Sequence, residues 1–279
     1  MKVITCANDK GGSCKTTTIL NLASQKALEG YNVLMIDLDS CGSLSNACHT
    51  NLSESENTIG MLLDPNKRKK SLTDRWSVAD ILKGISTVDS FTEYTAKIRN
   101  DHKGLKNLCI IPTADNELIS VRNNLMYETS RETVLKYMLK KLDETDAIKF
   151  DYVFVDCPGA MDVLTLNALV AADVVIVPFE ATQSNLSRLS PVFDVIYDVK
   201  IPDKHLNPDL EVAGVLACRA KRRKTENDIV EDVSKEYKFI GSIKESADVT
   251  RYDKKGVAIV VAKPYCDASL AYKKVSQMF

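Results

Sequence analysis

The feature that most constrains the fold is a glycine-rich loop between a short apolar segment and a helical one. Residues 8–18 read NDKGGSCKTTT, after the apolar residues 3–7 and at the start of an amphipathic stretch over 16–29. A strand that enters a helix through such a loop presents backbone N–H groups and the positive helix end to a polyphosphate. The sequence therefore predicts a phosphate site here, rather than a glycine turn that only caps a helix.

The rest of the chain repeats an alternation of apolar and amphipathic segments. Short runs rich in Val and Ile, typical of strands covered on both faces, occur at 3–7, 33–36, 109–112, 152–155, 174–178 and 212–217. Stretches long enough for crossover helices occur at 16–29, 115–126, 130–142, 162–171, 184–199 and 225–237. This order predicts an α/β fold with a doubly wound, mostly parallel sheet and helices on both faces.

A length of 279 residues is compatible with one substantial core. We expect a single domain over residues 1–279, with a helical and basic insertion at about 50–106. Weak helical segments at 58–63 and 77–82 flank the basic, proline-containing stretch 64–70, which is a minor candidate for polyanion binding.

The polar residues of the loop suit a nucleotide bound with a cation. Lys15 would contact the β and γ phosphates, the Thr16 hydroxyl would ligate Mg²⁺, and Thr17 could donate to the α phosphate. We therefore expect ATP or ADP with Mg²⁺ as ligands, bound by Lys10, Gly11, Gly12, Ser13, Cys14, Lys15, Thr16 and Thr17.

Carboxylates follow two of the predicted strands. Asp37 and Asp39 come after residues 33–36, and Asp156 comes after 152–155. Ligands bind at the carboxyl edge of a parallel sheet, so these side chains can approach a metal or a phosphate, although a strand-ending Asp can also simply cap a loop. The predicted metal-side residues are Thr16, Asp37 and Asp156.

The loop departs from the general P-loop pattern, because Asp9 and Cys14 stand where glycine is expected and Lys10 precedes the glycine pair. With its extra lysine it resembles the deviant Walker A motif of the ParA/MinD family of ATPases. The resemblance implies that Lys10 reaches across an ATP-bound homodimer to the partner's nucleotide. Cys14 departs even from the family pattern, which predicts altered affinity, slow turnover or sensitivity to oxidation.

The resemblance extends to two switch segments. Residues 37–45 correspond to switch I, in which Asp39 would position the attacking water, although Ser40 and Cys41 replace the usual Pro-Gln. Residues 157–159 (CPG) resemble switch II, a loop that can respond to the γ phosphate. The implied catalytic set is Lys10, Lys15 and Asp39, in an ATPase that is slow without a partner.

The biological role implied by the resemblance is that of a small ParA-type partition ATPase. ATP-bound dimers would bind double-stranded DNA nonspecifically, and a centromere-binding adaptor would stimulate hydrolysis. Since Lys and Arg number 37 against 38 Asp and Glu, such binding needs a local patch. Two basic clusters, which could also be solvated faces, supply the candidates: Arg219, Lys221, Arg222, Arg223, Lys224, Arg251, Lys254 and Lys255.

Other classes remain open. A MinD-like membrane-cycling ATPase would need an amphipathic C-terminal helix, but residues 267–279 contain few large apolar residues, and we expect Leu270, Val275 and Phe279 to pack in the core. An iron–sulfur ATPase resembling the nitrogenase iron protein would need closely spaced thiolates, and the eight Cys form no CxxC pair. A small-molecule ligase of similar fold is a further alternative.

The expected location is the cytoplasm, with nucleoid association in the ATP state. Cysteines within apolar runs favour reduced, mostly buried thiols, and no segment has the length of a secretion signal or a membrane span. The three His show no metal-ligand spacing and are assigned no chemistry.

Overall fold

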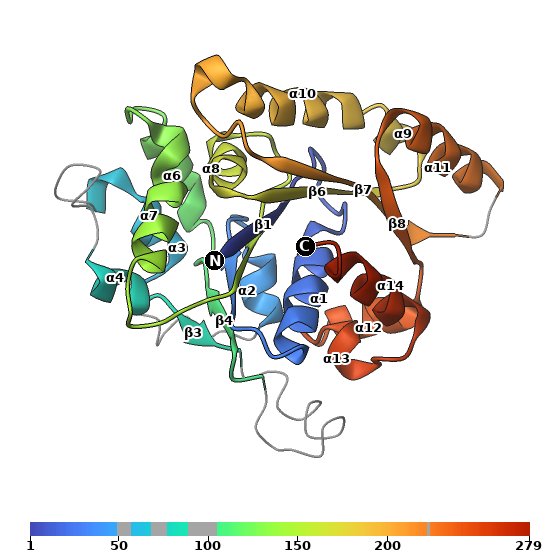
Figure 1. Ribbon diagram of the computed structural model, residues 1–279, viewed down its shortest axis with the longest axis horizontal. Coiled ribbons are helices and arrows are strands. Elements are labelled where there is room, and N and C mark those ends of the chain that lie inside the picture. The colour runs from blue at the N-terminus through green and yellow to red at the C-terminus, as the bar shows by residue number, and fades with distance from the viewer. Residues whose placement is uncertain (49–56, 68–76, 89–104, 222–223) are drawn as a thin grey trace.

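The computed structural model describes residues 1–48, 57–67, 77–88, 105–221 and 224–279, and its centre is one continuous sheet (Figure 1). Within these residues the strand order is β3-β4-β2-β5-β1-β6-β7-β8, parallel except for the antiparallel pairing of β3 with β4. The strands are β1 Lys2–Cys6, β2 Val33–Asp37, β3 Ser86–Thr87, β4 Leu108–Ile111, β5 Tyr152–Asp156, β6 Val174–Glu180, β7 Glu211–Ala220 and β8 Phe239–Lys244.

Helices cover both faces of the sheet, and each face has its own apolar core (Figure 1). One face packs on α1 Lys15–Leu28, α2 Ser43–Ala47, α12 Ala247–Asp253, α13 Ile259–Ala262 and α14 Asp267–Ser276. The other packs on α3 Ile59–Leu63, α4 Val78–Leu82, α6 Glu117–Leu125, α7 Val134–Asp143, α8 Val163–Ala171, α10 Leu189–Lys200 and α11 Lys224–Glu236, with the short α9 Gln183–Leu186 beside α11. The expected doubly wound α/β fold is confirmed.

The strand order places the loop after β1 at the centre of the molecule. β1 lies between β5 and β6, and β5 lies between β1 and β2. In the register, Asp156 pairs with both Cys6 and Asp37, so the ends of three strands meet at one edge. Because chain connections diverge to either side of β1 at this edge, the edge forms the crevice in which such folds bind ligands.

The N-terminus of α1 is unusually open to an anion. Its N-cap residue, Cys14, has a left-handed backbone (φ 65°), and no side chain caps the first turn. The first N–H groups of the helix therefore keep their capacity to bind a phosphate. At the other end, Gly30 follows the C-cap with φ 101°, as the sequence predicts for a helix stop.

Some details differ from the sequence interpretation. The edge strand β8 was not predicted, because only Ile240 and Ile243 of Phe239–Lys244 are buried and no continuous apolar run marks it. Leu270 was expected in the core but is 50% exposed, whereas Val275 on the same helix is buried and Phe279 is half-buried. Most of the predicted basic stretch in the insertion lies outside the described residues; its Lys67 contacts Glu117 at 3.8 Å.

Candidate functional site

A cavity of about 280 Å³ opens at the carboxyl edge of the sheet, against the N-terminus of α1. The loop supplies one wall, the segment after β2 a second, and the ends of β7 and α12 a third. Its lining includes Gly11, Gly12, Ser13, Cys14, Lys15, Thr16, Thr17, Asp39, Arg219 and Asp253. The structure thus brings Asp39 to the predicted phosphate loop, and it adds two groups from the far end of the chain.

The Lys15 side chain is folded back into the loop and is only 6% exposed. Its ammonium donates to the carbonyl oxygens of Lys10 (2.9 Å) and Asn8 (3.3 Å) and to Oγ of Ser13 (3.2 Å). All three acceptors are neutral, so they hydrogen-bond the ammonium group but do not neutralise its positive charge. A phosphate oxygen at the mouth of the loop would supply that charge.

Thr16 and Asp156 form the pair expected beside a nucleotide-bound cation. The Thr16 hydroxyl donates to Oδ2 of Asp156 at 2.6 Å, while Oδ1 of Asp156 is buried without a hydrogen-bond partner. Burial, and then the nearby carboxylate of Asp37, raise the pKa of Asp156 well above its usual value. An orphaned oxygen on a destabilised carboxylate fits a cation ligand, so these residues suit Mg²⁺.

Asp37 is fully buried and its oxygens are occupied within the chain. Oδ2 accepts from the backbone N–H and the hydroxyl of Ser45, both at 2.8 Å, and Oδ1 accepts from the N–H of Asp39 at 3.1 Å. Burial raises the pKa of Asp37 to about 6. Asp37 therefore holds the segment after β2 in place, and its predicted role as a metal ligand stays a prediction.

Asp39 lies at the cavity wall, in the predicted switch I segment. Its Oδ1 accepts the N–H of Cys41 at 3.0 Å, which closes a turn that fixes the carboxylate beside the loop. Ser40 and Cys41, which depart from the family motif, thus still support a local hydrogen-bonded turn around Asp39.

The predicted switch II glycine packs against the phosphate loop. A Cβ added to Gly159 would lie 2.9 Å from the backbone nitrogen of Gly11. A further cavity of about 320 Å³ lies between the two switch segments, lined in part by Gly11, Asp39, Pro158 and Asp162. Only a residue without a side chain allows this close approach, so the position requires glycine.

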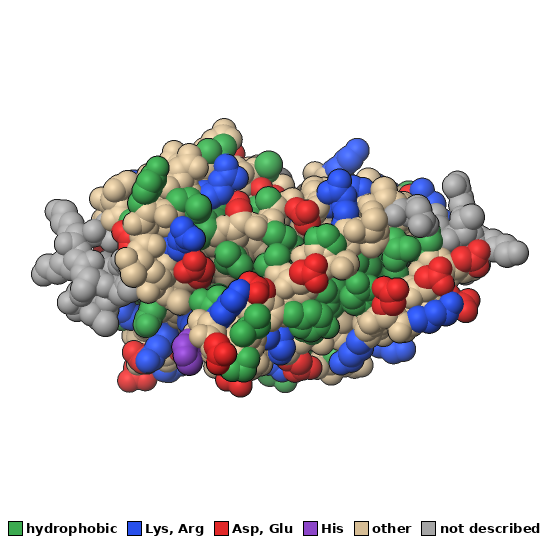
Figure 2. Space-filling model, turned by 90° about the horizontal axis from the view of Figure 1, so that it is seen from above, with side chains coloured by type: hydrophobic (Ala, Val, Ile, Leu, Met, Phe, Trp, Pro, Cys, Tyr) green, Lys and Arg blue, Asp and Glu red, His purple; other side chains and the backbone are tan. Residues whose placement is uncertain are grey.

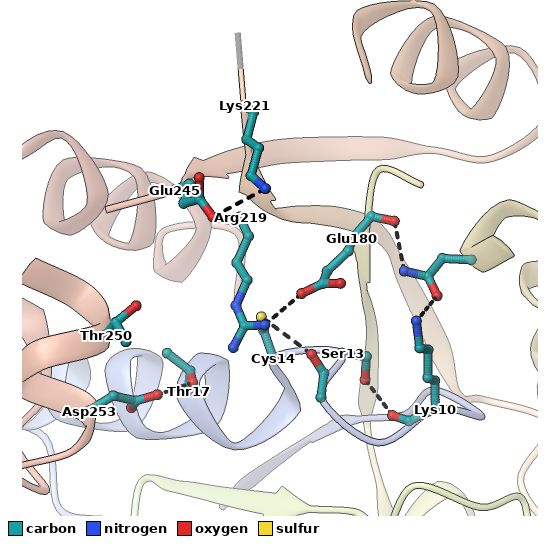
Figure 3. A network of polar contacts seen from close by, with 12 residues as sticks. Lys10, Ser13, Cys14, Thr17, Glu180, Arg219, Lys221, Glu245, Thr250 and Asp253 are labelled. Atoms are coloured by element: carbon teal, nitrogen blue, oxygen red, sulfur yellow. Dashed lines mark hydrogen bonds and ion pairs between the residues drawn. The ribbon is translucent and has the colours of Figure 1, made fainter. Parts of the chain in front are cut away.

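Lys10 does not line the cavity of its own chain. Its ammonium donates to Oδ1 of Asn185 at 2.8 Å, and Nδ2 of Asn185 donates to the carbonyl of Glu180 at 3.1 Å. The carboxylate of Glu180 in turn accepts from the guanidinium of Arg219 at 2.8 Å (Figure 3). One polar network therefore connects Lys10, the extra lysine of the loop, to the end of β7.

A second cavity of about 330 Å³ adjoins the first on the β7 side, and Cys14, Thr17, Arg219 and Asp253 line both. The lining that the second cavity does not share with the first comprises Cys218, Ile243, Lys244, Glu245, Ser246, Val249, Thr250 and Tyr272. Arg219 reaches it from an irregularity in β7, where its φ is 50°. A polar cavity continued by a partly apolar one can take a triphosphate and its base.

Asp253 is the main functional candidate that the sequence did not reveal. It accepts a hydrogen bond from the Thr17 hydroxyl at 2.7 Å (Figure 3), and burial raises its pKa above the usual value. In the sequence it lies within a basic cluster, and no motif links it to the loop. Only the packing of α12 against the site makes the connection.

Cys14 combines an unusual backbone with an unusual thiol. A left-handed conformation costs a residue with a Cβ on the order of 1 kcal/mol, and glycine would avoid that cost. The nearby thiol of Cys218 lowers the pKa of Cys14, and Arg219 lowers it further. Of the eight free cysteines five are buried, as expected.

The predicted basic residues occupy two places. Arg219 faces the nucleotide-sized cavities, whereas Arg251, Lys254 and Lys255 line an open groove of about 760 Å³ beside them. Ion pairs join Arg219 to Glu180 and Arg251 to Asp248, each at 2.8 Å, and Lys221 to Glu245 at 3.5 Å. Arg222 and Arg223 lie outside the described residues, as does the side chain of Lys224.

The face that carries α10 mixes acidic, basic and hydrophobic side chains, and neither sign of charge dominates it (Figure 2). His205 is exposed, and the other two His lie outside the described residues. Within the described ranges, no helix has both the length and the apolar character needed to cross a bilayer.

Metal binding by protein side chains alone finds no support in the part of the chain that the structure describes. No group of three or more His, Cys, Asp and Glu side chains is arranged there to hold a metal ion. The Thr16–Asp156 pair would therefore share a cation with phosphate oxygens, as Mg²⁺ commonly requires.

Comparisons with known proteins agree with this geometry. A family model described as an AAA domain (AAA_31) matches residues 1–212. The chain is 30% identical to the chromosome partitioning protein ParA of Caulobacter vibrioides over 99% of this chain and 93% of that one. It is 29% identical to the sporulation initiation inhibitor protein Soj of Bacillus subtilis over 85% and 80%.

A solved structure extends the comparison to ligands. Cobyrinic acid a,c-diamide synthase from Mycobacterium smegmatis, crystallised with a bound ATP analogue and magnesium, is 25% identical to the chain. The match covers 99% of this chain and 93% of the synthase chain, with a TM-score of 0.75. A relative with the same fold thus binds the two ligands for which the loop and the Thr16–Asp156 pair are suited.

Proposed function

The chain belongs to the ParA/MinD-type AAA domain family of ATPases, and on that premise we propose that it is a DNA partition ATPase that dimerises with ATP. The observation that carries the proposal is a single cavity that holds Lys15, Thr16 and Asp39 beside an uncapped helix N-terminus. These groups suffice to bind a triphosphate and to place a water molecule near its last phosphate.

The chain's own groups have distinct tasks in hydrolysis. Lys15 neutralises charge on the β and γ phosphates, and the N–H groups of the loop hold them in place. Mg²⁺, when bound with the nucleotide, adds positive charge at the β and γ oxygens; Thr16 and Asp156 would hold it. Asp39, fixed by its turn with Cys41, accepts a hydrogen bond from the attacking water.

Dimerisation is proposed because Lys10 lies outside its own phosphate cavity. Its ammonium is part-buried against Asn185, at the surface next to the loop, and it can be released by breaking one hydrogen bond. In a dimer that joins two such cavities, Lys10 would reach the partner's nucleotide, as the family resemblance implies. Hydrolysis then removes the phosphate that the lysine binds and favours the monomer.

Nonspecific DNA binding is assigned to the groove beside the nucleotide site. Arg251, Lys254 and Lys255 are exposed there, and the groove shares Glu245, Ser246 and Thr250 with the second cavity. Exposed ion pairs such as Arg251–Asp248 are weak because solvent screens the charges, so DNA phosphates can replace the carboxylate. Proximity to the nucleotide offers a direct route by which ATP controls this surface.

The biological consequence is cytoplasmic cycling on the nucleoid. ATP-bound dimers would coat DNA, a centromere-binding adaptor would stimulate their slow hydrolysis, and released monomers would rebind after nucleotide exchange. The similarity to the ParA protein of Caulobacter vibrioides supports this assignment over a ligase reaction. The C-terminal helix α14 packs on α1 through buried residues such as Tyr272 and Val275, which disfavours a membrane-inserting role.

The decisive experiment measures binding to a nonspecific duplex with ATP, with ADP and without nucleotide, over a salt series. Lys15→Ala should abolish ATP binding and DNA binding, and Lys10→Ala should retain ATP binding but lose ATP-dependent dimers. The double variant Lys254→Ala, Lys255→Ala should keep dimers and lose DNA. Its matched control is Lys140→Ala, Lys141→Ala, which removes two charges from α7.

The outcomes separate the candidate functions. ATP-dependent DNA binding with a salt slope reduced in the groove variant supports partition. ATP binding without DNA binding at any salt concentration would exclude it. Recruitment to anionic vesicles would then favour a membrane-cycling ATPase, and glutamine-dependent ADP formation would favour a ligase.

A further inference from the structure

The phosphate loop contains a thiol in a position that glycine would occupy at lower cost. Cys14 takes a left-handed backbone conformation and lines both cavities of the site, so its side chain lies at the junction between them. Figure 3 shows its sulfur atom beside the guanidinium of Arg219. A cysteine retained at such a position suggests a use for the sulfur atom itself.

A second thiol faces it from the sheet. Cys218 of β7 lines the same 330 Å³ cavity and is 1% exposed. The Thr18 hydroxyl lies 3.9 Å from the Cys218 sulfur and restricts where that sulfur can move. Two cysteines, one from the loop and one from β7, therefore face the same ligand cavity and are close enough to shift each other's pKa.

We infer that Cys14 and Cys218 form a reversible disulfide that closes the nucleotide cavity under peroxide; this rests on the proposed ATP-binding function. Hydrogen peroxide first oxidises the half-exposed Cys14 thiol to a sulfenic acid and is reduced to water. The Cys218 thiol then attacks that sulfur, the S–S bond forms, and the sulfenic oxygen leaves as a second water. The buried Cys218 needs no access to solvent, because the second step is intramolecular.

The bond would act on ATP binding directly. Cys14 borders both the phosphate cavity and its extension, so a bridge to β7 crosses the space that a nucleotide would fill. The bridge also draws the loop towards the sheet and misplaces the N–H groups at the start of α1. Because the two equilibria are coupled, bound nucleotide should protect the two thiols from oxidation by the same factor by which the disulfide weakens nucleotide binding.

The test treats the full chain with hydrogen peroxide and follows two readouts. Mass spectrometry of peptides without reduction should show Cys14 joined to Cys218, more slowly when ATP and Mg²⁺ are present. Titration with a fluorescent ATP analogue should show at least a tenfold loss of affinity, restored by dithiothreitol.

Variants identify the pair. Cys14→Ser and Cys218→Ser should each lack the crosslink and lose the peroxide effect on whatever ATP affinity they retain. Cys266→Ser removes another half-exposed thiol, one that lines neither cavity, and should behave as the wild type. Either cysteine variant alone tests the inference, so the test still works if one of the two fails to fold.

Each result has a clear meaning. If the reduced protein binds ATP but peroxide yields no Cys14–Cys218 peptide, the inference is wrong. It is also wrong if the crosslinked protein binds ATP as tightly as the reduced one. If the reduced protein fails to bind ATP, the proposed function fails instead, and the crosslink still reports whether the thiols pair.

Discussion

The carboxylate of Asp253 accepts a hydrogen bond of 2.7 Å from the hydroxyl of Thr17, although 236 residues separate them in the chain. Thr17 is the residue expected to contact the α phosphate, so nucleotide and Asp253 compete for one hydroxyl. Burial already raises the pKa of Asp253, and a triphosphate would add repulsion. We therefore expect this contact to oppose nucleotide binding.

Replacing Asp253 with Asn should therefore strengthen nucleotide binding. Asparagine keeps an oxygen that can accept from Thr17 but carries no charge, so ATP affinity should rise roughly fivefold at low salt. A titration with ATP at two salt concentrations measures the effect, which should shrink at high salt. Asp248→Asn, on the same helix but outside both nucleotide-sized cavities, is the control; equal behaviour of the two variants would refute the competition.

Gly159→Ala should disturb the phosphate loop without touching nucleotide directly. The added Cβ would meet the backbone of Gly11 at 2.9 Å, so either the loop or the CPG segment must move. We expect a loss of about 2 kcal/mol in the free energy of unfolding, from overpacking, together with weaker ATP binding. Chemical denaturation measures the change in the free energy of unfolding.

The matched control for that substitution is Gly11→Ala. A Cβ at Gly11 has no atom within 4 Å, so its free energy of unfolding should change little. If both variants are equally stable, the close approach of Gly159 to the loop does not constrain the structure.

The contact between Lys10 and Asn185 should set the ATP concentration at which dimers form. Asn185→Ala removes the acceptor that holds the ammonium, and should lower that concentration roughly fivefold. Asn185→Asp strengthens the contact with a charge and should raise it. Light scattering during an ATP titration distinguishes the two, and shifts in the same direction would show that Asn185 does not restrain Lys10.

Asp156→Asn should separate stability from function. The buried carboxylate has an unpartnered oxygen and a strongly raised pKa, so removing its charge should stabilise the nucleotide-free protein at pH 8 by on the order of 1 kcal/mol. The same change should abolish the Mg²⁺ dependence of nucleotide affinity. Thermal unfolding and ATP titration with and without Mg²⁺ test both effects, and unchanged Mg²⁺ dependence would remove Asp156 from the cation site.

The titration of Asp37 predicts how stability depends on pH without nucleotide. Since its folded-state pKa is raised to about 6, the stabilising contribution of the neutral form is complete below about pH 4 and lost as the pH rises through 6. The difference in pKa corresponds to roughly 3 kcal/mol at neutral pH. Asp37→Asn should remove this dependence of stability on pH. It should also lower the free energy of unfolding by the same amount at every pH, because the amide cannot accept the hydrogen bonds from both Ser45 and Asp39.

Urea unfolding of the wild type and Asp37→Asn at pH 4, 5, 6 and 7 gives the two slopes. A wild-type free energy of unfolding that rises over this range would contradict the assignment. Ser40→Ala, which leaves the hydrogen bonds of Asp37 intact, should show the wild-type slope.

The local sequence predicted the elements and the phosphate loop. Continuous Val- and Ile-rich runs marked the buried strands, because a strand covered on both faces has no polar side. Residues 8–18 alone predicted the loop, because its glycines, lysines and threonines lie close together in the sequence. No sequence pattern marked β8, in which only Ile240 and Ile243 are buried, or the exposure of Leu270.

Tertiary structure alone decided which distant residues complete the site. The contacts of Thr17 with Asp253 and of Lys10 with Asn185, and the cavity that Cys14 shares with Cys218, depend on how β7, α9 and α12 pack around β1. Side chains so far apart in the chain leave no periodicity or spacing for a sequence to show. The sequence therefore determined the chemistry of the phosphate loop, and the packing of the sheet and its helices determined the groups that restrain it.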